Sequence, residues 1–404
     1  MKALSQLPAL PRSDSCATSS RHHDDAGSGE QPLQVTEDSV RRPTLLTLDG
    51  GGVRGLSQLL ILGTRLGARP RLPTLESFPR VQPHDFFDLV AGTSTGGLIA
   101  IMLGQLRMSI DECIDAYRTL GEEVFRKPRL ASIRGPIPWL RPKFSHMKLE
   151  GVLHGIVQRH SGLASPLGPA PGNQPFRSPP GFCQTLVVAR GKDLDTGNPQ
   201  AFLFRTYSNR ITAHFRESKD VRCTPLSSIG SRNSHETPLI WKVARATSAA
   251  PTFFKSIKFQ GHSYVDGAVY ANNPARLAVE EVQQSFGSPS LLVSIGTGRS
   301  HKTVRHSTKS LYGKLRFFLD PSKKLSADSE EIHGELQDLF ANDPEASYYR
   351  FNVDTSLADV KLDEWKRGSS SNPGTFDTIL QHTKAYLSRE DVRNEIEKAA
   401  KSLI

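Results

Sequence analysis

The chain of 404 residues is 37% hydrophobic and 23% charged, and its formal net charge is +10. This length suffices for one large core or two modest domains, and the composition excludes both a wholly disordered chain and a membrane-embedded one. The positive charge favours anionic partners such as lipid headgroups or nucleic acid, although an ordinary basic surface explains it equally well.

Cysteine usage and the apolar runs bear on cellular location. The cysteines are far apart and form no CxxC pair: Cys16, Cys113, Cys183 and Cys223. This spacing argues against a zinc site of that type and against a disulfide framework, so we expect a reducing compartment. Prolines interrupt the first residues and no run of about 18 apolar residues occurs, which predicts neither a secretory signal nor a membrane span. We therefore expect a cytoplasmic protein, peripheral at membranes if it meets them.

The chain divides into three predicted regions. Residues 1–42 are rich in Ser, Asp, Gly, Arg and His, which predicts a disordered tail. Residues 43–298 carry alternating strand and helix patterns, which predict an α/β domain. Residues 299–404 are mostly helical in pattern, and we expect them to form an extension that packs on this domain.

Two strand–turn–helix units open the α/β domain. Residues 44–48 are typical of a buried strand, three glycines follow as a turn, and leucines then recur with helical spacing to position 66. Residues 86–91 are typical of a second strand, with a turn over 92–97 and a helix beginning at 98–103. This repetition predicts a parallel sheet.

The remaining elements follow in order. A helix is predicted over 110–124, and the proline-rich stretches 127–146 and 161–181 are predicted loops, long enough to be lids or insertions. The later strand candidates are 185–189, 202–207, 256–259, 291–295 and 348–353. The later helix candidates are 238–246, 274–286, 309–318, 330–340, 376–387 and 389–402.

The sequence Gly92-Thr93-Ser94-Thr95-Gly96 lies between the second predicted strand and its helix. A serine flanked by glycines at such a turn is typical of a nucleophile elbow, in which the hydroxyl stands at the N-terminus of a helix. The helix dipole favours the negative charge that develops during attack. Ser94 is therefore a candidate nucleophile, although turns of small residues also occur without chemistry.

A glycine-rich loop, Asp49-Gly50-Gly51-Gly52-Val53-Arg54-Gly55, follows the first predicted strand. Its free backbone N–H groups at a helix start suit an anion. One interpretation is a dinucleotide fingerprint, since Gly50, Gly52 and Gly55 satisfy GxGxxG. That fingerprint needs an acidic residue at the end of the next strand, and Glu76 lies between prolines instead. The other interpretation is an oxyanion hole for acyl transfer; a plain tight turn is the third.

Asp266-Gly267-Ala268 is the third candidate motif, at the end of a short apolar stretch. Taken alone, an Asp-Gly turn more often holds an aspartate that bonds its own backbone. A serine hydrolase usually also needs a histidine base, and none of the 13 histidines lies in a comparable turn. The sequence thus leaves two alternatives: a histidine from elsewhere, or a carboxylate bonded directly to the serine, with a pKa raised by burial.

These three motifs, in this order, resemble those of the patatin-like phospholipase family. The DGGGxRG loop is matched by residues 49–55, the GTSTG elbow by 92–96 and the DGA motif by 266–268. The stretches 246–254 and 272–274 also resemble the segments that flank DGA in the family. The resemblance covers roughly residues 43–298, the α/β domain, which would be the catalytic domain.

The resemblance implies a three-layer α/β/α sandwich with a mostly parallel central sheet. It implies a catalytic dyad of Ser94 and Asp266, supported by Gly267 and Ala268 of the DGA motif. The elbow would consist of Gly92, Thr93, Thr95 and Gly96 around the serine. The oxyanion hole would comprise Gly50, Gly51, Gly52, Arg54 and Gly55, with the amides of Gly51 and Gly52 as the donors.

The function implied is that of a lipid acyl hydrolase of the phospholipase A type, acting in lipid catabolism. Its substrate would be a phospholipid or another glycerolipid, with peripheral contact to an anionic membrane surface. The family chemistry implies no cofactor and no metal, and we expect no nucleic-acid partner. The alternatives are a nucleotide-binding protein that uses Gly50–Gly55, and a basic membrane-binding module without activity.

Overall fold

The computed structural model describes residues 41–64, 81–126, 128, 142–160, 170, 172–179, 181–207, 237–298, 321–353, 357 and 359–403. The described residues from 42 onward belong to one compact unit. Residues 1–40 of the predicted tail, the predicted helix at 309–318 and parts of both proline-rich loops lie outside the described residues.

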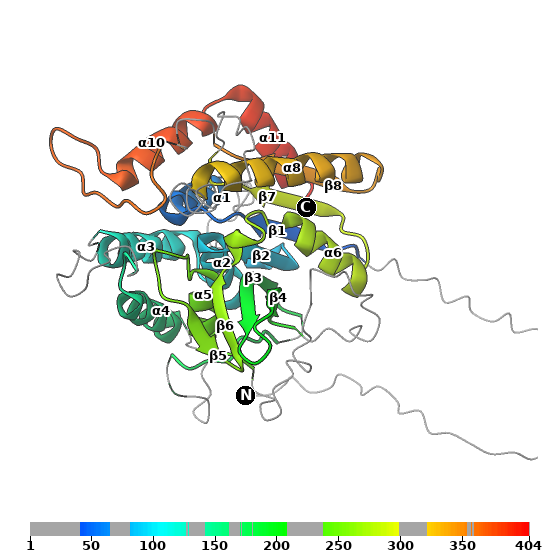
Figure 1. Ribbon diagram of the computed structural model, residues 1–404. Coiled ribbons are helices and arrows are strands. Elements are labelled where there is room, and N and C mark those ends of the chain that lie inside the picture. Colours follow the sequence, from blue (N-terminus) through cyan, green and yellow to red (C-terminus); the bar gives the residue numbers. More distant parts are fainter. Residues whose placement is uncertain are drawn as a thin grey trace, which may run out of the picture. The chain divides into compact units, whose positions relative to one another are not determined.

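Within the described residues, eight strands form one sheet in the order β5-β6-β3-β2-β1-β7-β8, with β4 paired to β3 (Figure 1). Strands β3, β2, β1, β7 and β8 are parallel neighbours, whereas β4, β5 and β6 are antiparallel additions. The strands are β1 Thr44–Leu48, β2 Leu89–Thr93, β3 Gln184–Asp193, β4 Pro199–Arg205, β5 Ile257–Phe259, β6 His262–Asp266, β7 Leu291–Ile295 and β8 Ser347–Phe351. The predicted mostly parallel sheet is therefore confirmed.

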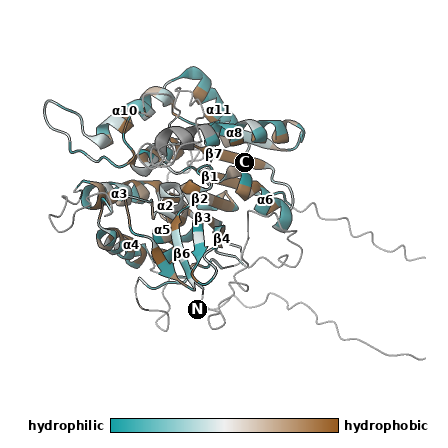
Figure 2. Cartoon of the chain, viewed as in Figure 1, coloured by the Kyte–Doolittle hydropathy of each residue, from teal (hydrophilic) through white to brown (hydrophobic). Residues whose placement is uncertain are grey.

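Side chains alternate between the two faces of a sheet along each strand, and in β1, β2 and β7 both faces are buried. In β1, Leu46 and Leu48 belong to one hydrophobic cluster and Leu45 to another. The first cluster packs under α1 Leu56–Leu62, α2 Thr95–Ala100, α3 Ile110–Leu120, α4 His146–His160, α5 Ile240–Thr247, α10 Thr375–Leu387 and α11 Glu390–Lys401. The second packs under α6 Ala275–Ser285 and α8 Pro321–Ala341. This is the expected three-layer arrangement, and the apolar strands β1 and β7 belong to its middle layer (Figure 2).

Short helical turns extend these elements near the glycine-rich motifs. Helices α2 and α3 continue into the π-helical turns η3 Ile101–Gln105 and η4 Gly121–Phe125. In the described residues, 3-10 turns precede or follow strands at η1 Gly52–Gly55, η2 Pro83–Asp85 and η6 Gly267–Val269. None of the helices in the described part of the chain is both long and apolar enough to cross a bilayer.

Several element boundaries differ from the sequence prediction. Strand β2 begins at Leu89 rather than at 86, because Phe86 and Phe87 leave η2 as irregular backbone while their side chains enter the core. Helix α4 was not predicted, although Leu149, Val152 and Ile156 repeat with helical spacing and are buried. Strand β6 was not predicted either. Strand β8 pairs with β7 in parallel, so part of the C-terminal region lies in the sheet itself.

Candidate active site

Strand β3 brings together two motifs that are far apart in sequence. Its first half pairs with β2, where Thr93 lies opposite Val188. Its second half pairs with β6, where Asp266 lies opposite Ala189. Strands β2 and β6 therefore end beside consecutive residues of β3. This register sets Ser94, the residue after β2, next to Asp266, the last residue of β6.

The backbone around Ser94 is a tight turn in the sparsely populated left-handed region. Ser94 has φ 56° and ψ −126°, between β2 and α2. A Cβ atom on Gly92 would lie 2.2 Å from the carbonyl oxygen of Gly96, and one on Gly96 would lie 2.3 Å from that of Leu48. The glycines of the predicted elbow are thus required by close backbone approach, and the strained turn projects the Ser94 hydroxyl toward β6.

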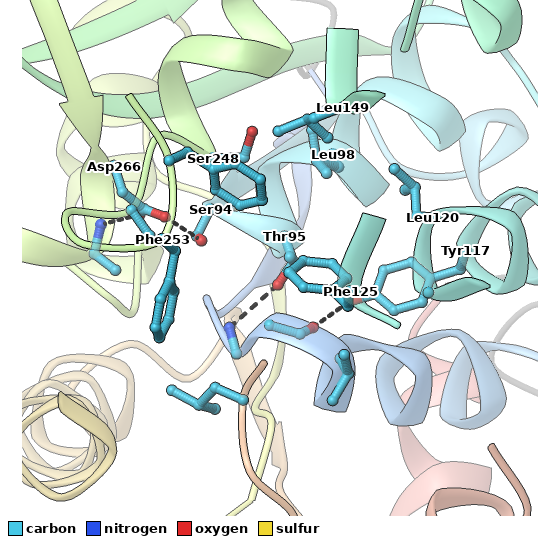
Figure 3. A pocket seen from close by; sticks show the side chains of 18 of the residues that line it. Ser94, Thr95, Leu98, Tyr117, Leu120, Phe125, Leu149, Ser248, Phe253 and Asp266 are labelled. Atoms are coloured by element: carbon cyan, nitrogen blue, oxygen red, sulfur yellow. Dashed lines mark hydrogen bonds between the residues drawn. The ribbon is translucent and has the colours of Figure 1, made fainter. Parts of the chain in front are cut away.

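Ser94 and Asp266 are in direct contact (Figure 3). The Ser94 hydroxyl donates to Asp266 Oδ2 at 2.5 Å, although 172 positions separate the two residues. Asp266 is 3% exposed, and burial raises the pKa of its carboxyl to about 7, against the opposing effects of the bonds from Ser94 and from the Ala268 amide. The Ala268 N–H donates to Oδ1 at 2.8 Å. One oxygen is thus held by the DGA backbone while the other faces the serine.

Thr247, the last residue of α5, holds the backbone of Ser94 in place through hydrogen bonds. The Ser94 N–H donates to Thr247 Oγ1 at 2.8 Å, and the Thr247 hydroxyl donates in turn to the carbonyl of Val188 at 2.6 Å. The same carbonyl would lie 2.3 Å from a Cβ on Gly267. Thr247 and Gly267 therefore tie both halves of the Ser94–Asp266 pair to β3.

The glycine-rich loop lies beside the serine, and two of its residues line the pocket. The Gly51 amide donates to Thr95 Oγ1 at 3.2 Å, and the Tyr117 hydroxyl donates to the Gly52 carbonyl. Gly52, at φ 56°, begins η1, where backbone amides lack an intrahelical acceptor. Gly51 and Gly52 thus line the pocket together with Ser94.

The other residues predicted for the oxyanion hole take different positions. The Gly50 amide donates to the Asn272 carbonyl at 3.0 Å, and Arg54 Nε donates to the carbonyl of Val360 at 2.5 Å. Gly50, Arg54 and Gly55 are not among the residues that line the pocket. The contacts of Gly50 and Arg54 fasten the loop to its surroundings, although a Cβ atom on Gly50 would lie 3.1 Å from the Ser94 Cβ.

Ser94 and Asp266 both line an apolar pocket, which has an empty volume of about 1050 Å³ when its mouth is included. Its walls are mostly apolar and include Leu98, Leu120, Phe125, Leu149 and Phe253 (Figure 3). Trp365 also lines the pocket. None of the described histidines lines it. Glu76 lies outside the described residues. In the described part of the chain, no group of His, Cys, Asp and Glu could hold a metal ion.

Sequence reasoning missed several residues of this site. Thr247 lies in the stretch 246–254, which carried a family resemblance but no assigned role. Tyr117 stood within a predicted helix with nothing to mark it. Leu362 and Trp365 line the pocket from the C-terminal region, where the sequence showed no motif. Only the first of these had a local signal that could have identified it.

Comparison with known proteins identifies the family of the chain. The family model for "Patatin-like phospholipase" matches residues 46–279. Calcium-independent phospholipase A2-gamma of Mus musculus is 29% identical over 365 residues, which cover 89% of this chain and 40% of that protein. Phospholipase A I of Arabidopsis thaliana is 28% identical over 402 residues, covering 88% of this chain and 29% of that protein. The chain thus spans less than half the length of these relatives.

A relative of more similar size and a solved structure were also found. Patatin-like protein 2 of Arabidopsis thaliana is 27% identical over 357 residues, which cover 78% of this chain and 77% of that protein. The crystal structure of VipD from Legionella pneumophila superposes with a TM-score of 0.40 at 12% identity, covering 90% of this chain and 67% of that one. Since the family model matches more than half of the 404 residues and contains all three motifs, the chain belongs to the patatin-like phospholipase family.

Proposed function

We propose that the chain hydrolyses ester bonds of glycerolipids, with Ser94 as nucleophile and Asp266 as general base. The observation that carries the proposal is the 2.5 Å contact between these two side chains at the base of an apolar pocket. A carboxyl with a pKa of about 7 suits this role, since a general base is most effective when its pKa lies near the working pH.

In the acylation step, Ser94 Oγ attacks the ester carbonyl carbon and its proton passes to Asp266 Oδ2. The carbonyl oxygen becomes an oxyanion, which the Gly52 amide would stabilise together with the Gly51 amide, once that amide exchanges Thr95 Oγ1 for the oxyanion. The C–O bond to the glycerol then breaks, and Asp266 returns the proton to the departing alkoxide. The lipid loses one acyl chain, which stays on Ser94 as an ester.

In the deacylation step, Asp266 removes a proton from a water molecule as its oxygen attacks the acyl carbonyl. The second tetrahedral intermediate collapses with Ser94 Oγ as the leaving group, and Oγ recovers the proton from Asp266. A free fatty acid leaves and the pair returns to its starting protonation state. The same two residues thus serve both halves of the reaction, so no histidine is required.

The walls of the pocket and the names of the relatives support a lipid substrate. A pocket lined by leucine and aromatic side chains favours a long acyl chain over a small polar ester. Several relatives are named phospholipases, and the net charge of +10 favours anionic headgroups and contact with an anionic membrane surface.

A panel of phospholipids and neutral glycerolipids, assayed for released fatty acid, tests this function. Ser94→Ala and Asp266→Asn should each lower kcat by a factor on the order of 10³ or more. The matched controls are Ser263→Ala on β6 and Asp193→Asn on β3, which lie outside the pocket and should keep wild-type rates. A fluorophosphonate should label the wild type at Ser94. Substantial hydrolysis by Ser94→Ala would eliminate the proposal.

A further inference from the structure

A segment of the C-terminal region, residues 359–367, forms one wall of the pocket; we call it the strap. Its Leu362 carbonyl accepts the Val53 amide at 2.8 Å, and its Val360 carbonyl accepts Arg54 Nε. A Cβ atom on Gly52 would lie 1.9 Å from the Leu362 carbonyl oxygen. The strap therefore packs directly on the glycine-rich loop, and only a glycine at position 52 permits this approach.

Trp365 is the strap residue that reaches the wall formed by α3 and η4. The side chain is 4% exposed, and a Cβ on Gly121 would lie 2.2 Å from its Cδ2 atom. The indole N–H donates to Glu122 Oε1 at 3.2 Å, and Arg367 Nε donates to the other oxygen of that carboxylate at 2.8 Å. Gly121 thus provides the space for the ring, and Glu122 provides its acceptor.

The position of Trp365 along the pocket follows from α3. Tyr117 marks the reacting end, because its hydroxyl bonds the Gly52 carbonyl. Gly121 lies four residues further, a displacement of about 6 Å along a helix axis. Both residues line the pocket, and the indole packs on Gly121, about one helical turn from Tyr117. Gly121 also begins a π-helical turn, a feature that often marks functional sites.

We infer that Trp365 sets the length of acyl chain that the pocket accepts. The inference rests on the proposed function, since it assigns the pocket to the acyl group of the substrate. The buried indole, packed on Gly121 about one helical turn from Tyr117, would block further extension of an acyl chain along this wall. The strap lies beyond the residues 46–279 that match the family model, so this wall belongs to the chain's C-terminal region rather than to the matched domain.

The test is a chain-length profile measured on the full chain with p-nitrophenyl esters from butyrate to palmitate. Trp365→Leu should raise the ratio of palmitate to butyrate kcat/KM on the order of tenfold, since each methylene accommodated in an apolar pocket contributes about that factor or more. Gly121→Ala, which pushes the indole away from the helix, should lower the ratio. Trp365→Phe should raise the same ratio less than Trp365→Leu does. Because it keeps the aromatic packing, it provides the test if Trp365→Leu folds poorly.

The matched control is Trp241→Leu, because Trp241 is a tryptophan of α5 whose ring packs against His154 and does not line the pocket. Its ratio should equal that of the wild type. An unchanged ratio in active Trp365→Leu and Trp365→Phe, or an equal change in Trp241→Leu, would overturn the inference and leave the proposed function intact. A wild type that hydrolyses no ester and is not labelled at Ser94 would overturn both.

Discussion

Asp49 and Arg350 form a buried, two-point ion pair, although 301 positions separate them. The guanidinium donates through its two terminal nitrogens to the two carboxylate oxygens, at 2.9 and 2.6 Å. Both side chains are no more than 3% exposed. Burial alone would lower the pKa of Arg350, but the Asp49 carboxylate raises it above its ordinary value. Asp49 precedes the glycine-rich loop and Arg350 lies on β8, so the pair connects the loop to the edge of the sheet.

Removing Arg350 should therefore damage both stability and catalysis. Arg350→Met leaves Asp49 buried without its partner, and such a change typically lowers the free energy of unfolding by about 3–5 kcal/mol. A shift of the loop by about 1 Å should reduce kcat/KM on the order of 10²-fold. Urea unfolding and ester hydrolysis measure the two effects.

The double variant Asp49→Leu with Arg350→Met separates charge burial from loop position. Because it removes both charges, it should recover most of the lost unfolding free energy. If the single variant were as stable as the wild type, the pair would have no structural importance.

The pH dependence of hydrolysis should follow Asp266. Below its pKa of about 7 the carboxyl is protonated and cannot accept the serine proton. We expect kcat/KM to fall about tenfold per pH unit well below 7 and to reach a plateau above it, since kcat/KM reports ionisations of the free enzyme. An uncharged p-nitrophenyl ester keeps the substrate from titrating. Full activity at pH 5 would contradict Asp266 as a base with a raised pKa.

The same carboxyl should make folding less favourable as pH rises. Between about pH 4 and 7 the folded protein retains the Asp266 proton while the unfolded chain, with an ordinary aspartate pKa of 3.8, releases it. The folded state thus binds more protons, so stability falls with increasing pH through this window. Asp266→Asn removes this titratable group. At pH 8 the unfolding free energy of the variant should therefore exceed that of the wild type by up to a few kcal/mol. The size follows because each pKa unit between the folded and unfolded states corresponds to about 1.4 kcal/mol.

At pH 4 this difference should vanish, which thermal or urea unfolding at both pH values will measure. Ser94→Ala is the informative companion, since the Ser94 bond lowers the Asp266 pKa and its removal should widen the window. A difference between Asp266→Asn and wild type that stays constant from pH 4 to 8 would contradict the raised pKa.

A local sequence signal sufficed to make Ser94 a candidate, because a glycine-flanked turn has a backbone signature that about five residues carry. Asp266 became a candidate only through the resemblance of three motifs in order, since its own turn favours a structural role. Local signals did not predict how the side chains of Ser94 and Asp266 come into contact. That contact depends on the register of β3 with both β2 and β6, and β6 had no recognised strand pattern. Arg350 and Trp365 illustrate the same limit, since each acts through a partner more than 200 positions away.

Thr247 is the residue whose removal should test the elbow most directly. It is fully buried, accepts the Ser94 amide and donates to the Val188 carbonyl. Thr247→Val keeps the shape but leaves both backbone groups unpaired, at a cost of about 1–3 kcal/mol for each. Part of this cost should appear as relaxation of the strained Ser94 backbone, so that Oγ no longer lies in reach of Asp266. We therefore expect kcat to fall more than KM rises, with slower fluorophosphonate labelling. Thr247→Ser, which retains the hydroxyl, should restore most of the rate; equal losses in the two variants would show that the methyl group, not the hydrogen bonds, holds the elbow.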